Sequence, residues 1–148
     1  MPKSSLRTKP GLLANNRMNK REAGVLSKFA KQAQLVTYDF DQDAGAQGSI
    51  NFGISLPDNS VVTAIFSDEL TALTSGGAAT LQLQAGATDL SDALAFDTGF
   101  SGTESQALAS SATAIKVGSS DDLTLDIATA DLTAGKVTFL IEFYSSEA

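Results

Sequence analysis

Short stretches in which apolar and polar residues alternate run through the chain from Leu35 onward. The alternation is clearest over residues 81–84, 123–127 and 137–143, where about every second residue is apolar. A period of two places the apolar side chains on one face of a strand. Glycine, aspartate, asparagine and serine separate these stretches, as is typical of turns. The pattern predicts about eight strands, over residues 35–40, 48–54, 61–67, 79–85, 93–97, 113–117, 123–128 and 136–144.

This many short strands predict an all-β fold, an antiparallel two-sheet sandwich. The number of strands and the spread of loop lengths favour a jelly roll over a seven-stranded immunoglobulin-like domain. Two segments fit two interpretations each. Residues 67–73 fit either one helical turn or the end of a long strand that begins at Val61. Residues 103–114 are rich in alanine and serine and fit either a short helix or a loop.

Residues 1–34 have a different pattern. Pro2, Pro10 and Gly11 predict an extended start, whereas residues 19–34 place apolar residues three and four positions apart. That spacing predicts a short amphipathic helix, which needs a surface to lie on because isolated helices of this length are marginal. The surface is either the chain's own body or a neighbouring protein. We therefore divide the chain into an N-terminal arm, residues 1–34, and a β-sandwich body, residues 35–148.

Charge divides the chain at the same place. The arm holds eight of the ten basic residues and one acid, Glu22, whereas the body holds Lys116 and Lys136 against sixteen acids. Such asymmetry is typical of an interaction tail on a globular domain. A basic arm can bind phosphates, but the acidic body repels them, so we expect no nucleic-acid partner. An acidic surface on another protein, or on a second copy, suits the arm better.

The composition removes most catalytic and metal chemistry. The chain has no His, Cys or Trp, which excludes histidine triads, thiol nucleophiles and zinc sites of the Cys/His type. A Ser–Lys dyad would need one of the two body lysines, and both lie in strand-like contexts. The paired acids fall in turns. We therefore expect no enzyme, no cofactor and no small-molecule substrate, and the apolar runs are too short to span a membrane.

Asp39, Asp41 and Asp43 resemble the start of a calcium-binding EF-hand loop. That loop needs a glutamate at its twelfth position, where this chain has Ile50 or Phe52. The sequence therefore excludes an EF-hand and leaves a different calcium site open. A carbohydrate- or calcium-binding sandwich is one alternative function. Against it, most aromatic residues fall in the strand alternation and are predicted to be core: Tyr38, Phe40, Phe52, Phe66, Phe96, Phe100, Phe139, Phe143 and Tyr144.

Several strand edges and turns together carry a family resemblance. They are Tyr38-Asp39-Phe40 with residues 45–48, then residues 56–63, 74–81 and 123–136. This part of the chain, residues 35–148, resembles the jelly-roll decoration, or cement, proteins of tailed bacteriophage capsids. The resemblance implies a homotrimer on the virion surface that clamps neighbouring copies of the major capsid protein, after assembly in the host cytoplasm. The arm is not part of the resemblance.

On this interpretation the arm anchors the trimer to the capsid. The expected apolar anchors are Leu12, Leu13, Val25, Leu26 and Phe29, and the expected partners of acidic capsid surface are Arg7, Lys9, Arg17, Lys20, Arg21 and Lys28. The alternative is a phage fibre, knob or tail adaptor, in which the arm inserts into a portal, tail or fibre base and the sandwich meets a host glycan. Copy number per particle separates the two functions.

Overall fold

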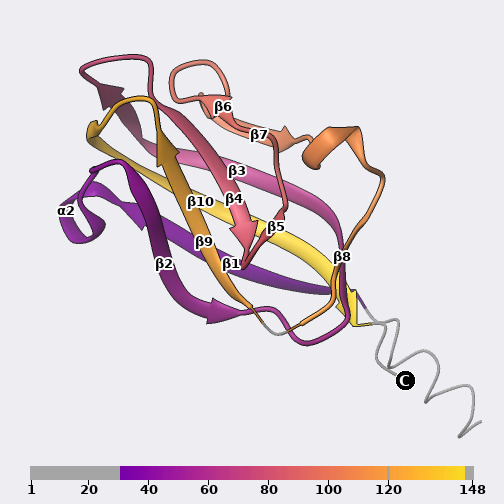
Figure 1. The fold of residues 1–148 in the computed structure, drawn as a ribbon. Helices are drawn as coiled ribbons and strands as arrows, with labels where there is room; N and C mark the ends of the chain where they lie inside the picture. The colour runs from indigo at the N-terminus through magenta and orange to yellow at the C-terminus, as the bar shows by residue number, and fades with distance from the viewer. Residues whose placement is uncertain (1–30, 120, 146–148) are drawn as a thin grey trace, which may run out of the picture.

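The computed structural model describes residues 31–119 and 121–145, which form two antiparallel sheets packed face to face (Figure 1). We call them sheet A and sheet B. Sheet A contains β1 (Gln32–Asp39), β10 (Leu132–Ser145), β3 (Ser60–Ser75) and β7 (Thr103–Gln106) in that order, with β8 (Ile115–Val117) also paired to β3. Sheet B contains β2 (Gly48–Ser55), β9 (Asp122–Ala128), β4 (Thr80–Ala85) and β5 (Thr88–Asp89), with β6 (Leu94–Ala95) paired to β4. The predicted all-β, two-sheet sandwich is confirmed.

The chain crosses repeatedly between the sheets, so strands that pair are mostly far apart in sequence. The C-terminal strand β10 lies between β1 and β3, and β9 lies between β2 and β4. Two short helical turns, α2 (Phe40–Asp43) and a 3-10 turn (Ala109–Ser111), interrupt the strands. Within the described residues, no helix is long and apolar enough to cross a membrane.

The core lies between the inner faces of the two sheets and follows the predicted alternation. In β10, Val137, Phe139, Ile141 and Phe143 are buried, and the residues between them are not. Sheet B contributes a matching set: Leu81, Leu83, Ala85, Leu123, Leu125 and Ile127. The Phe139 ring meets the Phe100 ring edge-on, with centroids 5.9 Å apart. Removal of this apolar surface from water is the main force that holds the sheets together.

The structure decides both open segments. Residues 67–73 belong to strand β3, which runs to Ser75, and register shifts along its pairing with β10 absorb the irregularity. Residues 103–106 form β7, which was not predicted as a strand, and the 3-10 turn follows it. The short strand β5 was also missed, and the strand predicted over 93–97 reduces to the two residues of β6. Strands this short carry too little alternation to be recognised.

The first strand begins earlier than predicted and ends earlier too. Residues 32–34, which the sequence assigned to the end of the arm helix, pair with Phe143, Glu142 and Ile141 of β10. A full-length neighbouring strand outweighs a weak helical pattern here. Phe40 lies in α2 instead of β1, because the Asp39 carboxylate accepts a hydrogen bond from the Asp41 amide and caps the turn. Residues 19–30 of the predicted helix lie outside the described residues.

Candidate interaction surfaces

The predicted binding residues of the arm all precede the described part of the chain. Arg7, Lys9, Leu12, Leu13, Arg17, Lys20, Arg21, Val25, Leu26, Lys28 and Phe29 therefore stay predictions. The structure does show where the arm joins the body. The Lys31 ammonium lies 3.1 Å from a carboxylate oxygen of Glu142. Because Glu142 points outward from β10, the arm meets the body at the outer face of sheet A.

A row of large apolar side chains crosses the outer face of sheet A. Leu35 of β1 lies opposite Leu140 of β10, and Leu140 lies opposite Phe66 of β3. Leu35 is 56% exposed and Phe66 is 37% exposed. We call these three residues the apolar row. A shallow groove of about 250 Å³ follows the row, lined by Leu35, Phe66, Ser67, Asp68, Thr103, Thr138 and Leu140.

Polar groups beside the apolar row are already paired with one another. The hydroxyls of Thr37 and Thr138 share a hydrogen bond of 3.0 Å across β1 and β10. The Thr103 hydroxyl donates to the Asp68 carboxylate at 2.7 Å. Buried neutral polar groups are costly mainly when they lose their partners, whereas a buried carboxylate is costly even when it keeps one neutral donor. Another apolar surface can therefore cover the Thr37–Thr138 pair at little cost, as long as the Asp68 carboxylate keeps its contact with water.

The same face balances its charges. Among the described residues there are three lysines, and all three belong to this face: Lys31, Lys116 and Lys136. The outward-facing acids of the sheet A strands are Asp39, Asp68 and Glu142. The described residues as a whole carry fifteen acids against those three lysines. The outer face of sheet A is thus a neutral region on a strongly acidic body.

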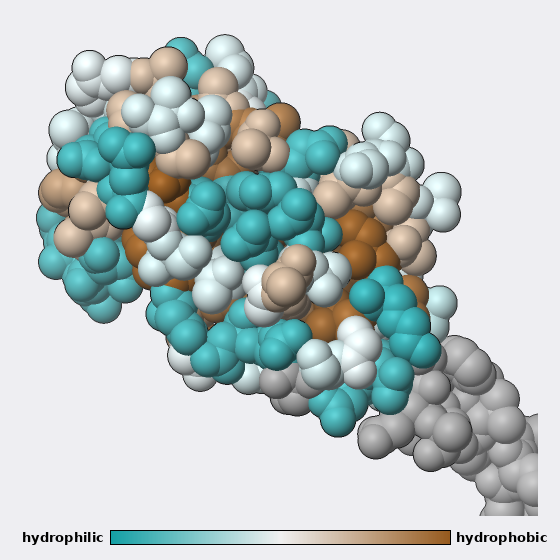
Figure 2. Space-filling model, viewed as in Figure 1, coloured by the Kyte–Doolittle hydropathy of each residue, from teal (hydrophilic) through white to brown (hydrophobic). Residues whose placement is uncertain are grey.

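The outer face of sheet B is polar throughout. Its outward residues on β2, β9 and β4 are mainly Ser49, Asn51, Ser55, Asp122, Thr124, Asp126, Thr80, Gln82 and Gln84. The described strands of this sheet contain no lysine. Polar residues cluster across the middle of this face, which is turned toward the viewer in Figure 2. A surface with so many polar side chains is well solvated by water.

Asp122 fastens the edge strand of sheet B. Its carboxylate accepts hydrogen bonds from the Asn51 side-chain amide at 2.8 Å and from the Ser55 hydroxyl at 2.6 Å. These two bonds lower the pKa of Asp122. They span the irregular stretch between Asn51 and Ser55, where the regular pairing of β2 with β9 is interrupted.

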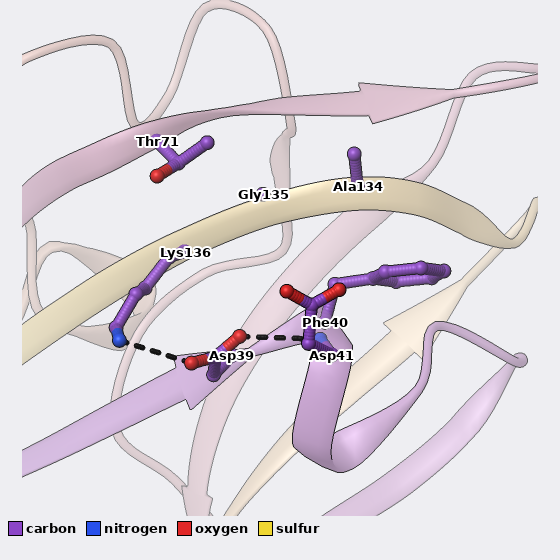
Figure 3. Close-up of a pocket in the computed structure, with 7 residues that line it drawn as sticks. All are labelled: Asp39, Phe40, Asp41, Thr71, Ala134, Gly135 and Lys136. Carbon is purple, nitrogen blue, oxygen red and sulfur yellow. Dashed lines mark hydrogen bonds and ion pairs between the residues drawn. The ribbon is translucent and has the colours of Figure 1, made fainter.

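A polar pocket of about 330 Å³ lies beside α2, where Asp39 pairs with the Lys136 ammonium at 2.9 Å (Figure 3). The bond from Lys136 is the main reason that the pKa of Asp39 is lowered. Asp43 accepts a hydrogen bond from the Asp39 amide, so two of the three aspartates that suggested a calcium site close the turn. Within residues 31–119 and 121–145, no three acidic side chains are placed to hold a metal ion.

Beneath that pocket, Tyr38 is fully buried and its hydroxyl donates to the Ala44 carbonyl at 2.9 Å. Burial, reinforced by the negative charges of Asp43 and Asp39, raises the pKa of Tyr38 to about 12. Tyr38 does not line the pocket, which offers an ion pair and a capped turn. None of these is a nucleophile paired with a base.

The apolar row was missed in the sequence, where Phe66 was predicted to be core. A signal for it exists. Leu35, Phe66 and Leu140 each stand directly beside a buried apolar residue, as Val36, Ile65 and Phe139 show. Such apolar doublets break the alternation and mark a strand that is apolar on both faces. Their alignment into one row depends on strand order, which periodicity does not give.

No family model matches the chain, and no curated protein matches it. Solved structures do share its fold. A chain in the capsid asymmetric unit of cyanophage Pam1 aligns with a TM-score of 0.56 and 13% identity, covering 80% of this chain and 86% of that chain. A chain in the acidic stable capsid structure of Helicobacter pylori bacteriophage KHP30 aligns with a TM-score of 0.50 and 8% identity, covering 79% of this chain and 89% of that one. At these identities the likeness is one of fold.

Proposed function

We propose that this chain is a structural protein of a bacteriophage virion, one that binds the outside of the capsid as a cement trimer. The fold shared with chains of two phage capsids, over about four-fifths of this chain, is the observation that carries the proposal. The described residues hold no arrangement that calls for catalysis. The partners are the major capsid protein and further copies of this chain.

In this proposal the arm, residues 1–34, anchors the body to the capsid. It is basic while the body is acidic, so the arm is drawn to an acidic capsid surface that repels the body. Opposite charges steer such an encounter, and apolar anchors then hold it. Val25, Leu26 and Phe29 are the proposed anchors that lie nearest to the body along the sequence. The Lys31–Glu142 ion pair fixes the point from which the arm leaves sheet A.

Co-sedimentation with capsids that lack this protein tests the proposal. The full-length chain is compared with a variant that carries Arg17→Gln, Lys20→Gln, Arg21→Gln and Lys28→Gln. A single Asp97→Asn substitution in the body, at an exposed position outside sheet A, is the control. We expect the arm variant to bind at least tenfold more weakly at low salt, because four charge contacts are lost, and we expect the control to bind normally. Unchanged binding by the arm variant would overturn the anchoring role.

Quantification of the protein in purified virions tests the cement role itself. A decoration protein is present in hundreds of copies per particle. A count of only a few copies would instead place the chain at the tail or portal, as a fibre or adaptor.

A further inference from the structure

We infer that copies of this chain associate through the outer face of sheet A, with the apolar row of Leu35, Leu140 and Phe66 at the centre of the contact. The inference rests on the proposed function, since it names the surface that makes the proposed trimer. In a three-fold assembly each copy turns this face toward the axis, so every row meets two symmetry-related rows.

The first argument is the apolar surface itself. Leu35, Phe66 and Leu70 are the large apolar side chains that stand exposed among the described residues, and all three belong to strands of sheet A. Scattered exposed apolar residues need no explanation, but a contiguous row framed by polar residues marks an interaction site. Register aligns Leu35, Leu140 and Phe66 on three neighbouring strands, so they act as one patch.

The second argument is electrostatic, and it selects a second copy as the occupant. Two acidic bodies repel each other over most of their surface, because the described residues carry fifteen acids and three lysines. The outer face of sheet A balances its charges, with Lys31 paired to Glu142 and Lys136 paired to Asp39. It is therefore the face at which two copies can meet without like-charge repulsion.

The basic arm is a poorer occupant of this face. Once Lys31 has paired with Glu142, this face is neutral and attracts the other positive charges of the arm less than the acidic remainder of the body does. Size also suits a second copy. The pairing of β10 with β3 extends over twelve residue pairs. The other strands of sheet A are shorter, with eight residues in β1, four in β7 and three in β8. With standard strand spacing and rise, the strands of sheet A together cover roughly 700 Å², within the range of about 600–1,000 Å² that each partner contributes to a standard interface.

The third argument is that burial of the apolar row leaves the hydroxyl groups beside it paired. Thr37 bonds Thr138, and Thr103 bonds Asp68, both within the one face. A partner sheet can therefore cover the apolar row without breaking these hydrogen bonds. The outer face of sheet B also pairs polar side chains, such as Asn51 and Ser55 with Asp122, but it has no apolar row and no cation among its described strands.

Sedimentation equilibrium of the full-length chain is the first test, with Phe66→Asp as the variant and Gln82→Asp as its control. Both substitutions add one negative charge at an outward position, one on each sheet. We expect a trimer for the wild type and for the control, and at least a hundredfold weaker association for Phe66→Asp. A wild-type monomer, or a Phe66→Asp variant that associates as tightly as wild type, would overturn the inference.

A second measurement holds even where Phe66→Asp does not fold. The chain contains no cysteine, so one introduced thiol reports the accessibility of its own position. We expect Leu35→Cys in the full-length trimer to react with a maleimide at least tenfold more slowly than Thr124→Cys on sheet B. Equal rates in a trimer would show that copies meet elsewhere. A monomer in which the Leu35→Cys thiol is protected would make the arm the occupant and overturn the inference.

Capsid co-sedimentation keeps this inference separate from the proposed function. A wild-type chain that binds capsids as a monomer, with the Leu35→Cys thiol protected only after binding, assigns this face to the capsid protein. That result keeps the virion role and overturns self-association. A trimer with a protected Leu35→Cys thiol that binds no capsid supports self-association through this face and overturns the virion role.

Discussion

The two sheets are built alike on their inner faces and differently on their outer faces. Inward, both present mainly buried apolar side chains, although sheet A also buries Ser60, Ser67 and Gln106. Outward, sheet B is polar and acidic, whereas sheet A carries the apolar row within a face of balanced charge. A sandwich needs only its inner faces to fold, so folding alone does not require the apolar row on the outer face of sheet A.

The sharpest test of this division uses two adjacent residues of β10. Phe139 is fully buried between the sheets, and Leu140 belongs to the apolar row. We expect Phe139→Ala to lower the free energy of unfolding by about 3–5 kcal/mol, because it leaves a cavity. Leu140→Ala should lower it by less than about 1 kcal/mol, as surface substitutions do. Urea denaturation at concentrations where the chain is monomeric measures both values.

On sheet B the matched pair is Leu125→Ala and Thr124→Ala. Equal losses for Phe139→Ala and Leu140→Ala would mean that the outer face of sheet A is part of the fold and not an interaction surface.

A transplant of apolar residues to sheet B is expected to have the next largest effect. Thr124 of β9 lies opposite Gln84 of β4 on the outer face. We expect Thr124→Leu with Gln84→Phe to create new association. Species larger than the wild-type assembly should then appear at a protein concentration about tenfold lower than the concentration at which the wild type forms them. The effect should remain below that of the native row, since Asp122, Asp126 and Asp89 surround the site. Light scattering across a dilution series measures it, and no change would show that apolar surface alone does not decide association.

Alkaline pH distinguishes the sheets through Tyr38, because the described strands of sheet B contain no tyrosine. Tyr38→Phe removes the hydrogen bond to Ala44 and should cost about 1 kcal/mol of unfolding free energy at neutral pH. The folded state holds the pKa of Tyr38 at about 12, above its ordinary 10.0. The contribution of the neutral Tyr38 to the free energy of unfolding is therefore fully present below pH 10 and is lost between pH 10 and 12.

Tyr38→Phe lacks this contribution, so the difference between the two proteins should shrink over the same range. Thermal unfolding of both proteins from pH 8 to 12 measures it. A constant difference across the range would mean that the Tyr38 hydroxyl is not held neutral by the fold.

Salt should produce the smallest difference, between the carboxylates that fasten the two edge strands. Asp39 holds the end of β1 through an exposed ion pair with Lys136, whereas Asp122 holds β2 through the neutral donors Asn51 and Ser55. Both pKa values are lowered, so both contributions are present near neutral pH and are lost as the pH falls into the acid range. Added salt should shrink the melting-temperature change caused by Asp39→Ala, because screening weakens exposed ion pairs.

The change caused by Asp122→Ala should persist in salt. If the melting-temperature change caused by Asp122→Ala depends on salt, or that caused by Asp39→Ala does not, the two carboxylates do not differ in the way proposed.

Periodicity was enough to predict most of this fold. Residues 123–127 and 137–143 each pack one face into the core as their alternation indicates, and the sandwich follows from them. Local pattern failed where a tertiary partner decided the outcome. Residues 32–34 became strand because β10 extends beside them, and the doublets at Leu35, Phe66 and Leu140 became one row only through the register of three strands. The predicted binding residues of the arm precede the described residues, so they stay predictions.

The pairing of β1 with β10 has a mechanical consequence. The arm continues directly into β1, whose eight residues each face a residue of β10, and β10 in turn is held by β3. Antiparallel hydrogen bonds lie perpendicular to their strands, so a pull along the axis of β1 is shared by the whole ladder at once. Tension along β1 is therefore resisted in shear and spread through sheet A, while a pull across the strand would open the ladder one rung at a time. The direction of the load, more than the number of contacts, sets the force at which β1 separates from β10.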